Sequence, residues 1–265
     1  MLKQILWFAQ RNTYDLIYLT AYEKHTFLID LLRYYGFEET RRLQSGELVL
    51  EKIITNGLLP TLTSSTLKFD RQYYPRFYDG PLAQKFIVPI QPDYHRRLFP
   101  EIAFGTELPL FPHESFAPVL TLGQDRTPGN TIRKVYLCRA QTRQMRPGDL
   151  LAFYMSKDEG YAGSQSITTI GVIEQVSEAR SAEDLMRATA KRSVFSAMDL
   201  GSMATASDGP VKVIDFLLVA HADPPISLRS LIGEGILAAA PQSIVKLSEA
   251  RYLLLRRQLH LGFDL

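Results

Sequence analysis

The sequence has one cysteine, no long apolar run and almost no net charge, and each shortage excludes a class of protein. Cys138 is the only cysteine among 265 residues, so no disulfide can form within the chain and a reducing cytoplasm fits it. The longest apolar run, from Val213 to Ala222, is interrupted by Asp215 and His221 and is far shorter than the roughly 20 residues of a membrane helix. The N-terminus shows no signal-peptide pattern. We therefore expect a cytoplasmic protein without a membrane segment.

A net charge of +2 leaves no global field that would draw the protein onto nucleic acid or membrane, so any basic surface must be local.

Common catalytic patterns are also missing. None of the five histidines pairs at metal-ligand spacing with another histidine or with Cys138, and no Gly-x-Ser-x-Gly elbow occurs. Cys138 itself lies among apolar neighbours, which favours a small buried side chain over a nucleophile. The residues alone predict no catalytic group and no metal site.

The first 54 residues carry the clearest pattern. Residues 2–11 have helical apolar spacing, and Leu16 to Leu19 form an apolar run that predicts a strand covered on both faces. A second helical stripe ends at Gly36, which suits a left-handed cap. Residues 37–43 and 48–54 then predict a hairpin.

This order of strand, helix, Gly36-Phe37 and two strands resembles the closing half of a GNAT-type N-acetyltransferase. The resemblance implies that the opening half, which holds the acetyl-CoA pyrophosphate, should precede residue 1. The nearest formal match to its phosphate turn, residues 126–131, follows no strand and contains Pro128. At the position of Leu32 the family often has a tyrosine that acts as a general acid. We therefore expect residues 1–56 to be a truncated, non-catalytic lobe without a cofactor. The alternative is an N-acetyltransferase that uses acetyl-CoA once a missing N-terminal segment or a partner completes it.

Residues 57–84 read as a connecting segment, rich in turn residues yet aromatic enough to pack against a domain. From residue 85 to residue 265 short strands dominate, with helices inserted between them. Pro89 predicts an edge position for the strand at 86–90. This pattern favours a small β-barrel, so the predicted fold class is α+β.

Four stretches in this part carry a second resemblance: Ile132–Cys138, Arg146–Tyr154, Ile167–Glu174 and Lys191–Ser196. They are similar to the PUA-like barrels of the EVE and ASCH groups. The resemblance implies a nucleic-acid module that receives a base or a modified base in a pocket beside the barrel. The predicted function is therefore binding of RNA or of modified-base DNA.

A base pocket needs an aromatic face, hydrogen-bonding groups and nearby cations for phosphate. The residues that fit this description are Arg133, Lys134, Arg139, Arg143, Arg146, Tyr154, Ser156, Lys157, Lys191 and Arg192. Structural roles remain open for them, since Tyr154 fits core packing and the arginines fit a solvated turn. His95 is a further candidate for the wall of a groove.

The strand at residues 16–19 raises a separate question. Without the strands of an opening half, one of its edges would be unpaired and prone to aggregation. A homodimer, a partner protein or residues 55–85 could cover it.

Overall fold

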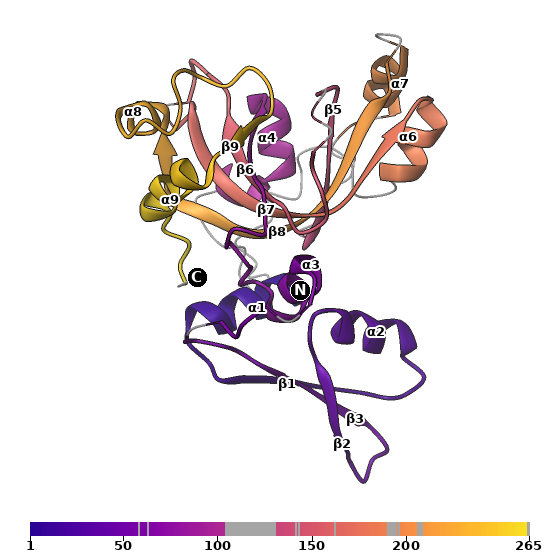
Figure 1. Ribbon diagram of the computed structural model, residues 1–265. Coiled ribbons are helices and arrows are strands. Elements are labelled where there is room, and N and C mark those ends of the chain that lie inside the picture. Colours follow the sequence, from indigo (N-terminus) through magenta and orange to yellow (C-terminus); the bar gives the residue numbers. More distant parts are fainter. Residues whose placement is uncertain are drawn as a thin grey trace.

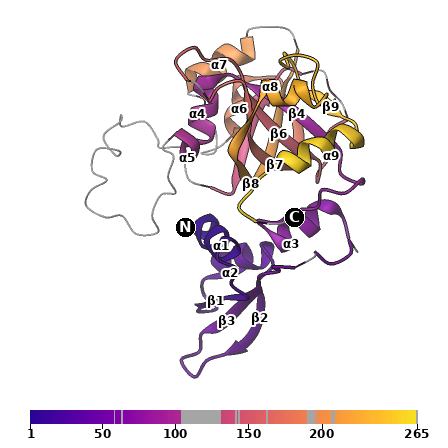
Figure 2. The ribbon, with the colours of Figure 1, turned by 90° about the vertical axis from the view of Figure 1, so that its left-hand side faces the viewer.

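The computed structural model describes residues 1–57, 59–62, 64–103, 131–140, 142, 144–161, 163–189, 195, 197–205 and 209–263. It is a mixed α+β fold with two sheets (Figure 1). The small sheet has the strand order β1-β3-β2, and the large sheet has the order β5-β8-β7-β6-β4-β9. Figures 1 and 2 show helices α1 and α3 between the two sheets.

The N-terminal lobe, residues 1–56, has the predicted order of elements. These are α1 (Leu2–Arg11), β1 (Leu16–Ala21), α2 (Thr26–Tyr34), β2 (Glu38–Arg42) and β3 (Leu48–Ile53). Gly36 has a φ of +80°, and a Cβ at this position would lie 2.4 Å from the carbonyl oxygen of Gln72. The predicted left-handed cap is confirmed, and the close approach of the next segment adds a second reason for glycine.

The burial of β1 differs from the prediction. Leu16, Tyr18 and Thr20 are exposed, and only Ala21 of this strand is fully buried. The expectation of a strand covered on both faces was wrong because helices pack on only one face of the small sheet (Figure 1). An apolar run alone does not show how many layers cover it.

The connecting segment packs across the molecule, as predicted. It forms α3 (Thr66–Tyr73), whose N-cap Ser65 accepts a hydrogen bond from the amide of Lys68 at 3.3 Å. Tyr74 and Phe77, which follow α3, are fully buried. They extend the hydrophobic core from the large sheet toward the N-terminal lobe.

The rest of the chain forms the large sheet and its helices. The elements are β4 (Lys85–Ile90), α4 (Pro92–Leu98), α5 (Pro100–Ala103), β5 (Arg133–Cys138), β6 (Leu150–Met155), β7 (Ser166–Ala179), α6 (Ala182–Thr189), α7 (Ala197–Thr205), β8 (Val211–Ser227), α8 (Leu228–Gly233), β9 (Val245–Leu247) and α9 (Glu249–Gln258). Strand β4 runs parallel to β6, and the other pairs are antiparallel. None of the described helices has the length and apolar content to cross a membrane.

Two details of this sheet correct the predictions. Strand β4 lies between β6 and β9, so Pro89 is not in an edge strand. The pairing with β9 covers only residues 85–87, so the missing amide of Pro89 disrupts no hydrogen bond to β9. In addition, no pairing among the described strands joins β5 to β9, so the sheet is open where a closed barrel was expected. Register shifts between β7 and β8 mark irregularities that bend these long strands.

Buried polar contacts attach the N-terminal lobe to the large sheet. Trp7 Nε1 donates to Tyr74 Oη at 2.8 Å, and Tyr74 Oη donates to the carbonyl oxygen of Leu218 at 2.7 Å. Lys3 of α1 forms an ion pair with Glu101 of α5. These contacts attach the lobe to β8 and to α5.

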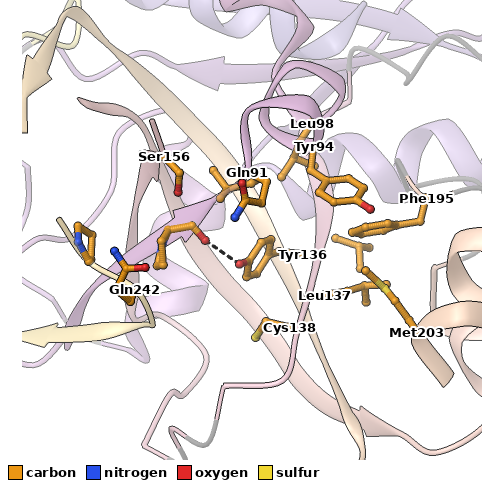
Figure 3. Close-up of a pocket in the computed structure, with 14 residues that line it drawn as sticks. Gln91, Tyr94, Leu98, Tyr136, Leu137, Cys138, Ser156, Phe195, Met203 and Gln242 are labelled. Carbon is orange, nitrogen blue, oxygen red and sulfur yellow. Dashed lines mark hydrogen bonds between the residues drawn. The ribbon is translucent and has the colours of Figure 1, made fainter. Parts of the chain in front are cut away.

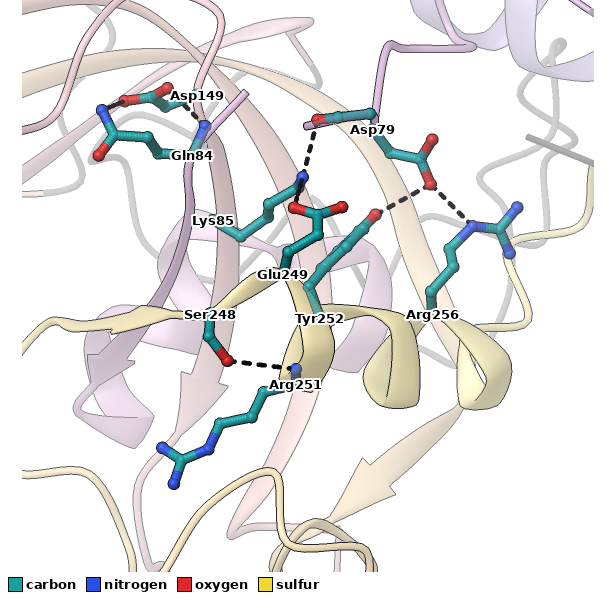
Figure 4. A network of polar contacts seen from close by, with 10 residues as sticks. Asp79, Gln84, Lys85, Asp149, Ser248, Glu249, Arg251, Tyr252 and Arg256 are labelled. Atoms are coloured by element: carbon teal, nitrogen blue, oxygen red, sulfur yellow. Dashed lines mark hydrogen bonds and ion pairs between the residues drawn. The ribbon is translucent and has the colours of Figure 1, made fainter. Parts of the chain in front are cut away.

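The last helix fixes the beginning of β4 (Figure 4). Asp79 accepts hydrogen bonds from Tyr252 at 3.1 Å and from Arg256 at 2.9 Å, and Lys85 pairs with Glu249 at 2.7 Å. Ser248 is the N-cap of α9 and accepts a hydrogen bond from the amide of Arg251. The residue that begins β4 is therefore held by a helix more than 160 positions later in the chain.

Candidate nucleic-acid interface

A cavity of about 290 Å³ opens where β4 and β6 end. Because these strands are parallel, their carboxyl ends meet at the same edge of the sheet. Gln91 follows β4, Ser156 follows β6, and the amide of Ser156 donates to the carbonyl oxygen of Ile90 at 3.0 Å. We call this cavity the β4–β6 pocket. Its lining residues are Pro89, Ile90, Gln91, Tyr94, Leu98, Val135, Tyr136, Leu137, Cys138, Ser156, Phe195, Met203, Pro241 and Gln242.

One end of the pocket is aromatic. Tyr94 of α4 and Phe195 have ring centroids 4.7 Å apart with an angle of 44° between the planes. Figure 3 shows both rings beside Met203 and Leu137 at this end. Aromatic rings in such a position present π-faces on which a planar ligand can stack.

Tyr136 of β5 lies in the middle of the pocket wall (Figure 3). Its hydroxyl donates to the carbonyl oxygen of Pro89 at 2.9 Å, and its ring packs edge-on against Phe153. Burial raises the pKa of the Tyr136 hydroxyl, so it stays protonated and continues to donate. The Tyr136 side chain thus forms a fixed part of the pocket wall and links β5 to β4.

The other end of the pocket is polar but uncharged. Figure 3 shows Gln91, Ser156 and Gln242 gathered there. Each glutamine amide offers both donors and an acceptor, and the serine hydroxyl offers both functions. None of the fourteen described lining residues carries a charge at neutral pH. The thiol of Cys138 also stays neutral, since burial raises its pKa.

Cations lie around the rim rather than inside. Lys157 follows the lining residue Ser156 and is largely exposed, at 3.2 Å from Glu159. Arg139 follows Cys138 and donates to the carbonyl oxygen of Met203. Arg97 lies 5.9 Å from the ring centre of Tyr94. The pocket therefore combines a neutral interior with a rim that can face phosphate.

The structure brings together some of the predicted residues. Ser156 lines the pocket, and Lys157 and Arg139 lie directly beside lining residues. Tyr154, by contrast, is fully buried one position before the end of β6. Arg143, Lys191 and Arg192 lie outside the described residues.

Three other predicted cations lie elsewhere. Arg133 forms an ion pair with Glu174, on the side of the N-terminal lobe. Lys134 is buried and donates to the carbonyl oxygen of Leu98 at 2.6 Å, and burial lowers its pKa to about 8. Arg146 lines a separate hollow with Lys246.

His95 has an interior position rather than a groove-lining one. It is buried, and its Nε2 lies 2.7 Å from Thr168 Oγ1. Burial, assisted by the nearby positive charge of Arg96, lowers its pKa to about 4. The ring is therefore neutral at physiological pH and packs against the sheet as a buried side chain.

Sequence reasoning missed the residues that give the pocket its character, namely Gln91, Tyr94, Tyr136, Phe195 and Gln242. Two of them lie in or beside segments that the sequence had marked. Phe195 belongs to the Lys191–Ser196 stretch, and Tyr94 directly precedes His95. Their convergence depends on the parallel pairing of β4 and β6, which no local pattern reveals.

The N-terminal lobe has no tyrosine at the position where the acetyltransferase pattern would place the general acid. Leu32 occupies that position and is buried in the core. The neighbouring Tyr34 donates its hydroxyl to Glu174, and burial followed by this contact raises its pKa. The formal phosphate-turn match at residues 126–131 lies largely outside the described residues. Among the described residues, no group of three or more His, Cys, Asp and Glu side chains could hold a metal ion.

No family model matches this sequence, and no curated protein matches it. Several solved structures resemble it. The ASCH protein of Zymomonas mobilis has 13% identity over 67% of this chain and 96% of its own, with a TM-score of 0.44. Human THYN1, in complex with DNA that contains 5-methylcytosine, has 12% identity over 67% and 99%, with a TM-score of 0.35. Rpa0253 of Rhodopseudomonas palustris has 11% identity over 66% and 92%, with a TM-score of 0.34. Similar structures thus include ASCH proteins, but the likenesses are too loose to assign a function.

Proposed function

We propose that this protein binds nucleic acid, RNA or modified-base DNA, and takes one unpaired base into the β4–β6 pocket. The observation that carries the proposal is the aromatic pair Tyr94 and Phe195 facing the amides of Gln91 and Gln242 across an uncharged cavity. A nucleobase is a neutral aromatic ring with donors and acceptors on its edge. It can stack at one end of this pocket and form hydrogen bonds at the other.

The size of the pocket supports a single base. Its volume of about 290 Å³ lies just below the range of roughly 300–1,000 Å³ that is typical of sites for drug-sized molecules, as expected for a smaller ligand. The absence of charge among the described lining residues disfavours a phosphate or carboxylate inside. Lys157 and Arg139 follow lining residues in the chain, and Arg97 lies 5.9 Å from the ring centre of Tyr94. These cations are therefore close enough to meet the phosphates on either side of a bound base.

Binding of a labelled single-stranded oligonucleotide, measured by fluorescence anisotropy at low salt, tests this function. Base stacking contributes about 1–3 kcal/mol per base, so Tyr94→Ala or Phe195→Ala should weaken binding by roughly 10- to 100-fold. The matched control is Tyr161→Ala, since Tyr161 is exposed but does not line the pocket. RNA and DNA of one sequence, with and without base modification, should be compared in parallel.

Two results would count against the proposal. If the unaltered protein binds none of these strands even at low salt, nucleic-acid binding is refuted. If Tyr161→Ala weakens binding as much as Tyr94→Ala, the pocket does not hold the base. Where binding is observed, rising salt should weaken it, since phosphate contacts release counterions.

We further propose that the N-terminal lobe is non-catalytic and binds no cofactor. Leu32 cannot donate a proton, and Tyr34 is committed to Glu174. Titration of the full chain with acetyl-CoA in a calorimeter should give no heat of binding. Micromolar binding would instead restore the alternative function of an N-acetyltransferase.

A further inference from the structure

The two edges of the small sheet differ in charge. Strand β2 has the sequence Glu-Glu-Thr-Arg-Arg and is exposed at every position, so its edge carries charges that oppose pairing with another strand. Strand β1 has the sequence Leu-Ile-Tyr-Leu-Thr-Ala and carries no charge. In the part of the chain that the structure describes, β1 pairs with β3 and with no other strand. Helix α3 of the connecting segment lies between the two sheets and not along this edge (Figures 1 and 2), and Asn56 caps only its beginning by donating to the carbonyl oxygen of Tyr14 at 3.0 Å.

The register shows which backbone groups of β1 point to the free edge. The amide of Ile54 donates to the carbonyl oxygen of Asp15 at 2.9 Å, and these residues continue the register in which Leu16 lies opposite Ile53. Antiparallel pairs alternate between hydrogen-bonded and non-hydrogen-bonded positions. Residues 15, 17, 19 and 21 therefore bond to β3. Leu16, Tyr18 and Thr20 direct their amides and carbonyls outward.

The side chains at this edge are arranged symmetrically about Tyr18. Tyr14, Tyr18 and Tyr22 recur every four residues and are 51%, 62% and 43% exposed. In an antiparallel pair of two identical strands centred on Tyr18, residue 14 lies opposite residue 22. Residue 16 lies opposite residue 20, and residue 18 lies opposite itself. The outward-directed backbone groups of Leu16, Tyr18 and Thr20 thus meet one another. The amide and carbonyl of Tyr14 already bond to Ala9 and Asn56, so this residue contributes only its ring.

We infer that a second copy of this chain covers the edge, with β1 pairing antiparallel to β1 of that copy about a two-fold axis at Tyr18. The two small sheets then form one continuous six-stranded sheet. Tyr18 contacts Tyr18 of the second copy, and Tyr14 contacts its Tyr22, so three aromatic pairs accompany the backbone hydrogen bonds. A neutral edge meets a neutral edge, so this pairing brings no like charges together. The same patch on both copies forms the contact, as two-fold symmetry requires.

Sedimentation velocity of the full chain over a range of concentrations tests the association. The unaltered protein should shift from monomer to dimer as concentration rises. Tyr18→Lys places two like charges at the axis and should leave only monomer where the unaltered protein is dimeric. The matched control is Thr40→Lys, since Thr40 is exposed on the opposite edge, and this variant should dimerise normally.

Cross-linking tests the register and does not depend on a variant that weakens association. In a Cys138→Ala background, Tyr18→Cys should form an intermolecular disulfide under mild oxidation, because facing residues lie about 5.5 Å apart between Cα atoms. Leu16→Cys should not, because the two copies of residue 16 would be about 13 Å apart at roughly 3.4 Å per residue. A protein that stays monomeric at every concentration overturns the inference. So does a dimer unaffected by Tyr18→Lys, or equal cross-linking through Leu16→Cys.

Discussion

At the scale of single residues, Glu174 connects four elements from both parts of the molecule. Its buried carboxylate, on β7, accepts from Tyr34 of α2, Arg71 of α3 and Arg133 of β5. The Arg71 contact measures 2.9 Å. A buried carboxylate is stable only when such partners replace the water that it has lost. Glu174 therefore stabilises the junction between these elements.

Replacing this carboxylate by an amide should destabilise the protein measurably. Glu174→Gln leaves two arginines without a negative partner, and because both are partly exposed to water we expect a loss of about 1–3 kcal/mol in the free energy of unfolding. Urea denaturation measures this loss. Glu159→Gln, which alters an exposed pair with Lys157, is the matched control and should change stability by less than about 0.5 kcal/mol. Equal effects of the two substitutions would contradict the role given to Glu174.

His95 predicts a dependence of stability on pH. Burial lowers its pKa from the ordinary value of 6.5 to about 4, so between these values the unfolded chain binds more protons than the folded protein. This contribution is complete above pH 6.5 and is lost as pH falls toward 4, with a slope of at most about 1.4 kcal/mol per pH unit.

The measurement is urea denaturation at a series of pH values in that window. His95→Gln keeps a group that can bond to Thr168 but cannot titrate, so its stability should fall less steeply with acid. His221 retains its own contribution in this variant, since burial also lowers its pKa, to about 3. Parallel pH profiles of the two proteins would show that His95 does not take up a proton on unfolding.

At the scale of elements, the turn before β6 shows how one glycine docks a helix. Gly148 has a φ of +87°, and a Cβ at this position would lie 1.8 Å from Thr66 Oγ1 at the start of α3. Asp149 next to it accepts from the amides of Gln84 and Arg146 at 2.8 Å each. The turn therefore joins β6 to β4 and leaves room for α3 at the same point.

This geometry separates backbone strain from steric contact. Gly148→Ala introduces both backbone strain and a clash with Thr66, so we expect it to destabilise the protein by about 2 kcal/mol or more. Gly46→Ala is the matched control, because Gly46 has a φ of +84° and open space around it. It should cost only the backbone strain of about 1 kcal/mol. Thermal unfolding compares the two variants, and equal losses would show that the contact with Thr66 has no effect.

Much of the order of elements could be predicted from the sequence. Local signals are sufficient where one residue fixes the backbone, as Gly36 does after α2 and as Ser227 and Ser248 do at the starts of α8 and α9. The apolar run from Val211 to Ala220 is a local signal of the same kind, and all ten residues are buried in β8. These signals depend on groups a few residues apart.

The rest depends on contacts between distant segments. The exposure of Leu16 and Tyr18 depends on the number of layers over the sheet, and the position of Pro89 depends on how far β9 extends. Tyr154 and Ser156 are two positions apart, yet one is in the core and the other lines the pocket. Their environments differ because β6 ends between them, at Met155. The sequence located the region of the pocket but not its walls.

At the scale of the whole molecule, the lobe and the large sheet share one core. Trp7, the only tryptophan, lies at their junction and bonds to Tyr74, which bonds in turn to Leu218 of β8. Side chains from both parts belong to the same hydrophobic cluster. The two parts should therefore unfold together.

Trp7 fluorescence and far-UV circular dichroism should accordingly give the same midpoint in urea. Tyr74→Phe removes the acceptor for Trp7 and the donor for Leu218, so both midpoints should fall together, by an amount equivalent to about 1–3 kcal/mol. A fluorescence transition that precedes the loss of circular dichroism would show that the lobe detaches first.

The β4–β6 pocket is assembled from parts of the chain that are synthesised far apart in time. Gln91 emerges early, whereas Gln242 on the facing wall emerges more than a hundred residues later. A nascent or prematurely terminated polypeptide that ends before Pro241 therefore carries an incomplete cavity. Such a fragment also lacks β9 and α9, which hold the beginning of β4, so the wall that carries Gln91 is not fixed either. Base binding is therefore expected only after the segment that includes α9 has been synthesised.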